Sequence, residues 1–237
     1  MIKQQLAAIK SDIETELTHI GQANRHVRLI AVSKTQPMQA VVEAYALGVR
    51  DFGENFMQEL CDKAAIASQQ NLQIQWHFLG HLQRNKINKF LAINPWPILH
   101  SLDREELMQA LAQRVAAAPD AIAPLQVLVQ VNIGRESQKS GVFPENTRAF
   151  VEKALTYKQL RVLGLMAIPP EDEDPTPFFA AMRGLLQEIQ VLTGGENIKE
   201  LSLGMSQDFA LALPFGATMV RVGRLLFGDR KPQGALP

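Results

Sequence analysis

The sequence predicts an α/β fold in which eight strand–helix units close into a barrel. Short strand-like apolar runs alternate with helix-like segments from residue 28 onward. The first run, Leu29 to Val32, has no polar interruption, which is typical of a parallel strand covered on both faces. Polar residues follow directly after these runs, where (β/α)₈ barrels carry their functional groups. Eight alternations match the count of a TIM barrel, although an open doubly wound sheet shows the same alternation.

An additional helix precedes the first strand, within residues 1–24. Its apolar residues recur at steps of three and four, and Gly21 follows them as a stop signal. These apolar residues are Ile2, Leu6, Ile9, Ile13, Leu17 and Ile20. Because this helix lies before the first strand, we expect it to pack across one end of the barrel.

The remaining elements follow from periodicity and from turn signals. Strands are predicted near 28–33, 49–53, 75–79, 97–102, 125–132, 160–166, 199–204 and 218–223. Helices are predicted near 38–47, 55–69, 83–91, 103–117, 145–157, 177–192, 206–213 and 224–228. Asp103 and Glu106 have the spacing of a capping box, and Pro144 suits the first turn of its helix.

Length and composition predict one soluble domain spanning residues 1–237, with the helix in 1–24 and the barrel in 28–228. Lysines and arginines number 24, as do aspartates and glutamates, so charge favours neither nucleic acid nor an anionic membrane as a partner. A single cysteine, Cys61, excludes an internal disulfide and a thiolate metal cluster. No signal sequence or membrane span is evident, so we expect a cytoplasmic protein without a metal.

The segment 169–177 interrupts the regular alternation after the sixth predicted strand. It contains four prolines and four acidic residues, and it follows a strand end, so it lies on the functional rim. This composition favours an exposed, mobile, solvated connection over a loop that binds a partner.

Lys34, at the end of the first predicted strand, is the central candidate residue. Taken alone, a lysine at this position is a solvated cap, a phosphate ligand or a Schiff-base amine. Other strand ends contribute polar residues that a barrel would bring to the same mouth. These are Glu54, Asn55, His77, His81, Gln83, Asn85, Lys86, Ser101, Asp103, Ser206, Arg221 and Arg224.

The turns after the last two strands predict a phosphate site. The segment from Gly204 to Asp208 and the segment from Val222 to Arg224 each lead from a strand into a helix. Loops after strands seven and eight form the usual phosphate site of a barrel, because backbone N–H groups there favour a dianion. Ser206 adds a hydroxyl donor, although the same serine would serve as a helix N-cap.

A phosphate site combined with a strand-end lysine suggests pyridoxal 5′-phosphate as the cofactor. Its aldehyde would form an imine with Lys34. Arg221 would then face the pyridine nitrogen, and a guanidinium there would discourage protonation of the ring and weaken it as an electron sink.

The motifs together resemble those of the pyridoxal phosphate homeostasis proteins, the YggS/PROSC/PipY group, over nearly the whole chain. The matching segments are 31–35 (AVSKT), 52–55 (FGEN), 76–86 (WHFLGHLQRNK), 164–166 (GLM), 203–208 (LGMSQD) and 219–223 (MVRVG). Each segment alone is weakly specific, but the combination in this order is highly specific.

The resemblance implies the alanine-racemase N-terminal type of barrel, standing without the second domain of the racemases. It implies a non-catalytic protein that holds the cofactor as a Schiff base on Lys34 and acts in intracellular cofactor homeostasis and amino and keto acid balance. It also implies Asn55 and Met166 near the cofactor, Arg221 at the ring nitrogen, and Ser206 with Gly223 and Arg224 at the phosphate. Position 224 is often threonine in such sequences and is arginine here. A contact from a hydroxyl group to the phosphate is therefore not expected at this position, whereas the contact from the backbone is.

Two enzymatic alternatives remain at this point. A racemase needs a second base, but Tyr45 and Tyr157 fall in helix-like stretches, residues 228–237 are too few for a further domain, and only His81 could stand in. An aldolase-type enzyme would place its lysine on a later strand and gives no reason for Arg221. We therefore expect a monomeric cofactor carrier that serves apo-enzymes dependent on pyridoxal phosphate.

Overall fold

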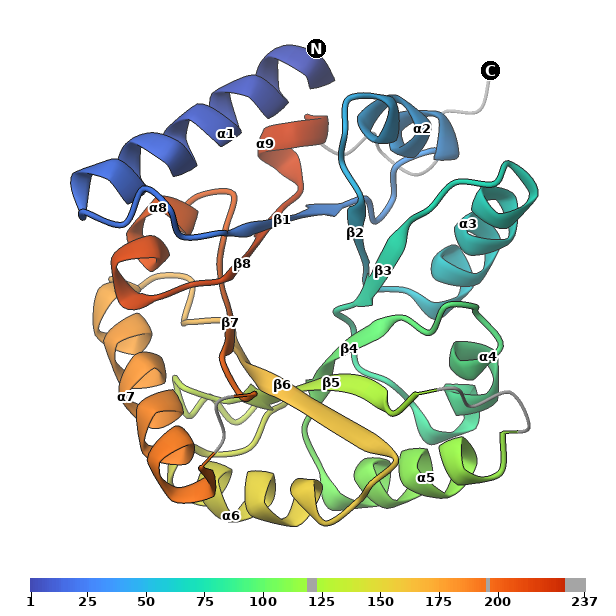
Figure 1. Cartoon of the computed structure of the whole chain (residues 1–237), viewed down its shortest axis with the longest axis vertical. Coiled ribbons are helices and arrows are strands. Elements are labelled where there is room, and N and C mark those ends of the chain that lie inside the picture. Colours follow the sequence, from blue (N-terminus) through green and yellow to red (C-terminus); the bar gives the residue numbers. More distant parts are fainter. Residues whose placement is uncertain (119–122, 195–196, 229–237) are drawn as a thin grey trace.

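The computed structural model describes residues 1–118, 123–194 and 197–228, and these contain a closed barrel of parallel strands in sequence order (Figure 1). The strands are β1 (Arg28–Val32), β2 (Asp51–Glu54), β3 (Gln75–Phe78), β4 (Ile98–Leu102), β5 (Leu125–Val131), β6 (Leu160–Ala167), β7 (Glu200–Met205) and β8 (Met219–Val222). The barrel closes where β1 pairs with β8, with Ile30 opposite Arg221. The predicted barrel is thus confirmed, and the open sheet is excluded. Residues 229–237, the end of the predicted domain, lie outside the described residues.

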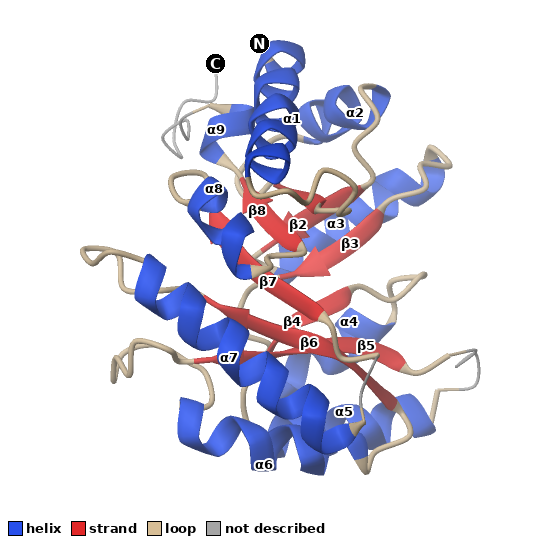
Figure 2. Cartoon of the chain, turned by 60° about the vertical axis from the view of Figure 1, so that its left-hand side comes forward, coloured by secondary structure: helices blue, strands red, loops and turns tan. Residues whose placement is uncertain are grey.

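Helices surround the barrel on its outer side, as Figures 1 and 2 show together. They are α1 (Ile2–His19), α2 (Met38–Ala46), α3 (Met57–Gln69), η1 (Arg84–Lys86), α4 (Ile87–Leu91), α5 (Glu105–Ala116), α6 (Pro144–Leu155), α7 (Thr176–Thr193), α8 (Phe209–Ala212), η2 (Leu213–Phe215) and α9 (Arg224–Phe227). Each predicted strand and helix has a counterpart near its predicted position. None of the helices in the described ranges is long and apolar enough to cross a membrane.

Helix α1 joins the outer ring of helices, which corrects the expectation that it packs across one end. It contacts α2, α8, η2 and α9 and lies beside α8 and α9 in Figure 1. The helical segments after β7 and β8 are short, so α1 covers an outer side of the barrel that they leave open. Its predicted apolar stripe is buried there, at Ile2, Leu6, Ile9, Ile13 and Leu17.

The predicted capping box at Asp103 and Glu106 is wrong. Helix α5 begins at Glu105, its N-cap residue is Arg104, and no side chain caps it. Asp103 instead accepts a 2.5 Å hydrogen bond from the neighbouring Arg104 guanidinium. Pro144 does occupy the first turn of α6, as predicted.

The apolar core divides into two parts separated by the sheet. The larger part lies between the strands and the surrounding helices. The smaller part is a separate cluster consisting of Ile30, Ile98, Leu128, Leu163, Met166 and Met219. Buried polar side chains accompany this small cluster, notably His77, His100, Ser202 and Arg221. The barrel is therefore a packed core whose contents are partly polar.

We predict that Gly164→Ala strongly destabilises the barrel at the β6–β7 contact. A Cβ at this position would lie 1.8 Å from the carbonyl oxygen of Glu200, so the two strands would have to separate. We expect a loss of about 3 kcal/mol or more in the free energy of unfolding, measured by urea denaturation. Gly184→Ala in α7 is the matched control, because a Cβ there meets nothing within 4 Å. It should stabilise the helix by about 0.5–1 kcal/mol, and equal effects of the two variants would contradict the packing explanation.

Candidate functional site

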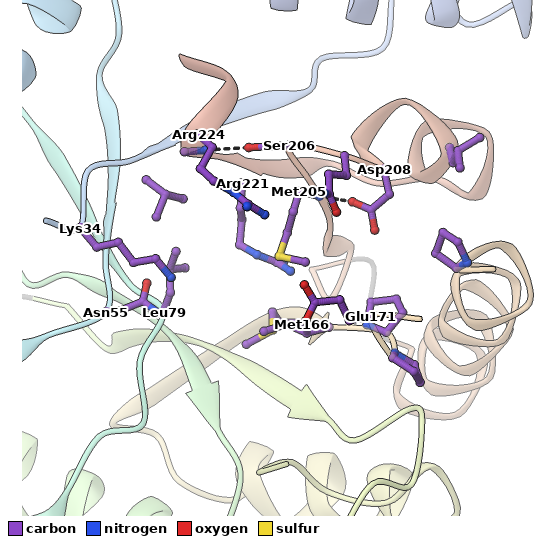
Figure 3. A pocket seen from close by; sticks show the side chains of 18 of the residues that line it. Lys34, Asn55, Leu79, Met166, Glu171, Met205, Ser206, Asp208, Arg221 and Arg224 are labelled. Carbon is purple, nitrogen blue, oxygen red and sulfur yellow. Dashed lines mark hydrogen bonds between the residues drawn. The ribbon is translucent and has the colours of Figure 1, made fainter. Parts of the chain in front are cut away.

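A pocket of about 530 Å³ lies at the carboxyl ends of the strands (Figure 3). The structure brings all of the predicted site residues to its lining, namely Lys34, Asn55, Met166, Ser206, Arg221, Gly223 and Arg224. In Figure 3, Lys34 and Asn55 extend from one side of the pocket, and Ser206 lies on another side. Arg221 lies between them. The barrel therefore places the Lys34 amine, the buried Arg221 guanidinium and the Ser206 hydroxyl around a single cavity.

The end of β1, which carries Lys34, is fixed by a buried ionic cluster on its outer side. The Ser33 hydroxyl donates a 2.7 Å hydrogen bond to Glu54 Oε1. Lys63 Nζ, from α3, donates to the same oxygen at 2.6 Å and to the Ser33 carbonyl at 2.7 Å. These bonds tie the backbone next to Lys34 to β2 and α3.

The residue after Lys34 adopts an uncommon backbone conformation. Thr35 has a φ of 63°, in the left-handed region that non-glycine residues rarely occupy. Its N–H donates a 2.8 Å hydrogen bond to Glu59 Oε2, which supports the turn from the α3 side. Such strain persists only where the surroundings fix the chain, and it is frequent at functional sites.

Glu54 supports the site and does not line it, which corrects its placement among the residues of the barrel mouth. Its side chain is fully buried beside Lys63, away from the pocket. Burial raises the Glu54 pKa, while the charge and hydrogen bond of Lys63 oppose this effect. Removing Lys63 would leave a buried carboxylate without its cation, which is much more costly than the loss of an exposed ion pair.

The turn after β7 meets the turn after β8 at Ser206. The Ser206 hydroxyl oxygen accepts hydrogen bonds from the Gly223 N–H at 3.2 Å and the Leu225 N–H at 3.4 Å. Both backbone N–H groups therefore point toward one oxygen atom in the pocket wall. A phosphate oxygen needs converging donors of this kind. Gly204 permits the turn, because its φ is +80° and a Cβ there would lie 2.6 Å from Phe209 Cα.

Arg221 is buried in the barrel and remains a cation. Its Nη1 donates to the Ser202 carbonyl at 2.6 Å and to the Ser202 hydroxyl at 2.7 Å, and its Nη2 donates to the Ala167 carbonyl at 2.9 Å. Burial lowers the Arg221 pKa to about 10, and the charge of Asp208 opposes this shift. At neutral pH the protonated guanidinium therefore outnumbers the deprotonated form by a factor of roughly a thousand. It presents hydrogen-bond donors to the pocket and no acceptor.

The segment 169–177 forms part of the pocket wall, so the prediction of a solvated connection is wrong for its first half. Pro169 and Pro170 are buried, and Glu171 and Glu173 also line the cavity. Lys139, from the β5–α6 connection, donates a 3.2 Å hydrogen bond to the Pro169 carbonyl. The composition correctly predicts that the acidic residues are exposed. The contact between segment 169–177 and the β5–α6 connection has no local sequence signal.

Several polar residues predicted near the mouth do not line the pocket. His77 is buried inside the barrel, where it contacts His100 and Asp51. His81 is exposed beside Asp103, with 3.2 Å between Nδ1 and Oδ2, and does not line the pocket. Asn85 also lies outside the pocket lining, as do Gln83, Lys86 and Ser101. Within the described part of the chain, no group of three histidine, cysteine or acidic side chains is arranged to hold a metal ion.

Comparisons with known proteins agree with this architecture. The family model described as the alanine racemase N-terminal domain matches residues 4–231. The pyridoxal phosphate homeostasis protein of Aquifex aeolicus is 38% identical over 231 residues, which cover 96% of this chain and 98% of that protein. The protein of the same name from Pseudomonas aeruginosa is 39% identical over 232 residues, covering 97% of this chain and 96% of that protein.

Solved structures give the same result. PipY of Synechococcus elongatus, solved with PLP bound, is 32% identical with a TM-score of 0.82 and covers 96% of this chain and 100% of that chain. Alanine racemase from Corynebacterium glutamicum is 17% identical with a TM-score of 0.65, and the match covers 95% of this chain and 62% of the racemase. The racemase likeness supports the predicted fold type and nothing beyond the fold.

The cluster that fixes β1 generates a testable prediction. Lys63→Met should cost about 3–5 kcal/mol of unfolding free energy, because it strands the buried Glu54 carboxylate. The double variant Lys63→Met/Glu54→Gln should be more stable than Lys63→Met alone, since no buried charge remains. Urea denaturation of the single and double variants measures both effects.

The exposed Lys153 contacts Glu105 and provides the matched control, because Lys153→Met removes a lysine whose pair faces solvent. That variant should change the unfolding free energy little. A Lys63→Met protein as stable as the Lys153→Met protein would contradict the role of the buried cluster.

Proposed function

We propose, from the premise that the chain belongs to the pyridoxal phosphate homeostasis protein family, that it binds pyridoxal 5′-phosphate reversibly in the pocket at the barrel mouth. The observation that carries the proposal is the convergence of Lys34, Arg221 and Ser206 on one cavity. These residues come from the ends of β1, β8 and β7, and each suits a different part of the same ligand. The bound structure of PipY, similar along its whole length, supports the same ligand class.

The residues present fit the phosphate end of the ligand. The N–H groups of Gly223 and Leu225 converge on the Ser206 hydroxyl, and the side chain of Arg224 lines the same cavity. A phosphate accepts hydrogen bonds from such donors and is further favoured by a guanidinium. A methyl group at Gly223 would lie 3.2 Å from the Val32 carbonyl oxygen, so glycine suits this close approach of strands.

The aldehyde end would lie at Lys34. When bound, the ligand supplies an aldehyde carbon that condenses with a primary amine to form a Schiff base and release water. Lys34 would supply that amine from a strand end fixed by Glu54 and Lys63. Asn55 and Met166 would line the ring between the two ends of the ligand.

Arg221 would set the electronic state of the ring. Because the guanidinium is charged and only donates hydrogen bonds, it would meet an unprotonated pyridine nitrogen. An unprotonated ring withdraws electrons weakly, so carbanion chemistry at the bound aldehyde would be poorly supported. This property suits a protein that holds the aldehyde.

The placement of the tyrosines also favours a non-catalytic protein. A racemase needs a second base facing the lysine across the ligand. The Tyr45 hydroxyl accepts a 3.1 Å hydrogen bond from the Gln73 N–H, which precedes β3. Tyr157 lies just before β6, where the sequence predicted a helix. Neither tyrosine lines the pocket, and His81 also lies outside its lining.

The proposed carrier is a cytoplasmic monomer formed by one barrel domain. It would keep the reactive aldehyde at a low free concentration and release it to apo-enzymes that depend on it. Through those enzymes it would contribute to amino and keto acid balance. Release would require that an incoming amine replaces Lys34 at the aldehyde carbon and that the phosphate leaves its site, so the pocket must remain open to solvent.

Lys34→Ala tests this function directly. The native protein should develop the absorption band of a lysine-bound aldehyde when pyridoxal phosphate is added, and Lys34→Ala should abolish that band. Lys139→Ala removes the other lysine that lines the pocket and should retain the band, because its ammonium is held by Glu136 and Pro169. A native protein that stays colourless, or a band lost only in Lys139→Ala, would contradict the proposal.

The racemase alternative is tested by incubating the loaded protein with single enantiomers of common amino acids. Chiral chromatography should detect no racemisation above that produced by free pyridoxal phosphate. Racemisation well above that level, and absent from Lys34→Ala, would establish an enzyme instead.

A further inference from the structure

A string of polar side chains runs through the barrel from Arg221 to Asp51. The Ser202 hydroxyl contacts Arg221 at 2.7 Å and His100 Nδ1 at 3.1 Å. His100 Nε2 lies 2.9 Å from His77 Nδ1, and His77 Nε2 lies 2.9 Å from Asp51 Oδ1. Ser202 is on β7 and His100 is on β4, which are not neighbours in the sheet, so their contact crosses the barrel interior.

With both imidazoles neutral, the two ends of the string determine the direction of every hydrogen bond in it. Arg221 can only donate, so the Ser202 oxygen accepts there. The Asp51 carboxylate can only accept, so His77 Nε2 carries a proton and Nδ1 accepts from His100. His100 must then carry its proton on Nε2 and accept the Ser202 hydroxyl at Nδ1. Each intermediate member donates once and accepts once, and both imidazoles are the Nε2–H tautomer.

The surroundings keep both imidazoles neutral. His77 and His100 are fully buried, and desolvation lowers the pKa of each, that of His100 well below the ordinary range. Asp51 and Glu200 oppose the shift at His77, while Arg28 lowers the pKa of both histidines and Arg221 lowers that of His100. Protonation of either ring would also reverse at least one hydrogen bond of the string and leave the Ser202 hydroxyl proton without His100 as its acceptor.

The far end of the string lies at the opposite end of the barrel from the pocket. Asp51 begins β2, and its carboxylate is 3.6 Å from the Arg28 guanidinium at the start of β1. Arg221 and Asp51 therefore carry opposite charges at the two ends of one oriented chain of hydrogen bonds. Such chains polarise one another and fix the position of their members.

We propose that Ser202, His100 and His77 form a positioning relay that holds the Arg221 guanidinium in the pocket and couples it to Asp51 at the opposite end of the barrel. The relay exists in the protein alone. Its effect on a bound pyridine ring rests on the proposed function, since that effect requires the ring nitrogen to face Arg221. These residues do not touch the ligand, so they act only through Arg221.

The proton arrangement is tested first without any ligand, by long-range ¹H–¹⁵N spectra of the protein labelled with ¹⁵N-histidine. We expect His77 and His100 to appear as single Nε2–H tautomers that do not change between about pH 5 and pH 8. The exposed His19, His26 and His81 provide reference signals in the same spectrum. A protonated ring, or mixed tautomers at either buried histidine, would overturn the relay.

Variants at the two ends then test the coupling. Ser202→Ala removes one hydroxyl. Arg221 keeps its hydrogen bonds to the backbone carbonyls of residue 202 and Ala167, so the fold should survive. Asp51→Ala removes the terminal acceptor, whereas Asp51→Asn keeps an acceptor oxygen. We expect mixed histidine tautomers in Asp51→Ala, which loses the terminal acceptor. The native pattern should persist in Asp51→Asn and in Ser202→Ala, where Asp51 still fixes the proton position of both rings.

The same variants are then loaded with pyridoxal phosphate, and the absorption band is titrated with pH. Ser202→Ala and Asp51→Ala should each move the pH midpoint of the band by about half a pH unit or more, which is the scale of one lost hydrogen bond. The midpoint of Asp51→Asn should lie much closer to that of the native protein. Ser101→Ala is the matched control, since it removes a buried serine hydroxyl on β4 that bonds to Gly80 and not to the string.

Unchanged midpoints in both alanine variants would show that the string is only structural and would overturn the coupling. A midpoint moved equally by Ser101→Ala would overturn it as well. If the native protein forms no band, the proposed function fails, and the histidine spectra of the unloaded variants still decide whether the relay exists.

Discussion

The pairing of β1 with β8 is the contact on which the rest of the site depends. It closes the barrel and sets Ile30 opposite Arg221 and Ala31 opposite Val222. Lys34 follows the end of β1, and Gly223 and Arg224 follow the end of β8, so this pairing brings the amine and the proposed phosphate site to the same cavity. Without closure, the first and the last strands of the sheet would lie at opposite edges, and no single small ligand could reach both.

The contents of the barrel explain how the buried Arg221 is held beside the pocket. A barrel of this size is filled by side chains, and here a polar string replaces part of the apolar filling. Buried polar groups are tolerated only when every donor and acceptor is satisfied, and the string from Arg221 to Asp51 satisfies this condition through one consistent set of bonds. The same bonds hold the Arg221 guanidinium at the pocket, where under the proposed function it would face the ring nitrogen of the cofactor.

Much of this site was predictable from the sequence, because its residues follow strands that periodicity identifies. Lys34, Ser206 and Arg221 each lie at or just after the end of an apolar run, and parallel strands collect such residues at one edge. The resemblance to the homeostasis proteins added the roles expected of Asn55 and Met166. Those roles remain proposals, while the placement of the residues around one cavity is observed.

The features that the sequence did not reveal depend on contacts between distant segments. The polarity of His77 and its place near a strand end predict a position at the mouth. The alternation of β3 instead points it into the barrel, where it contacts His100 and Asp51. Pro169 and Pro170 were expected in solvent, and the contact with Lys139 places them in the wall of the pocket. The strand-end position of Glu54 predicts a place at the mouth, but Lys63, nine residues later in α3, binds its carboxylate on the outer side of the barrel. No local pattern encodes these pairings.

The most direct measurement is to reduce the protein loaded with pyridoxal phosphate by sodium borohydride, which makes the lysine–aldehyde bond permanent, and to map the modified peptides by mass spectrometry. We predict that at equimolar ligand the reduced pyridoxyl mass is found on the peptide that contains Lys34. Modification of other lysines with Lys34 left unmodified would contradict the central claim that this strand-end amine holds the cofactor.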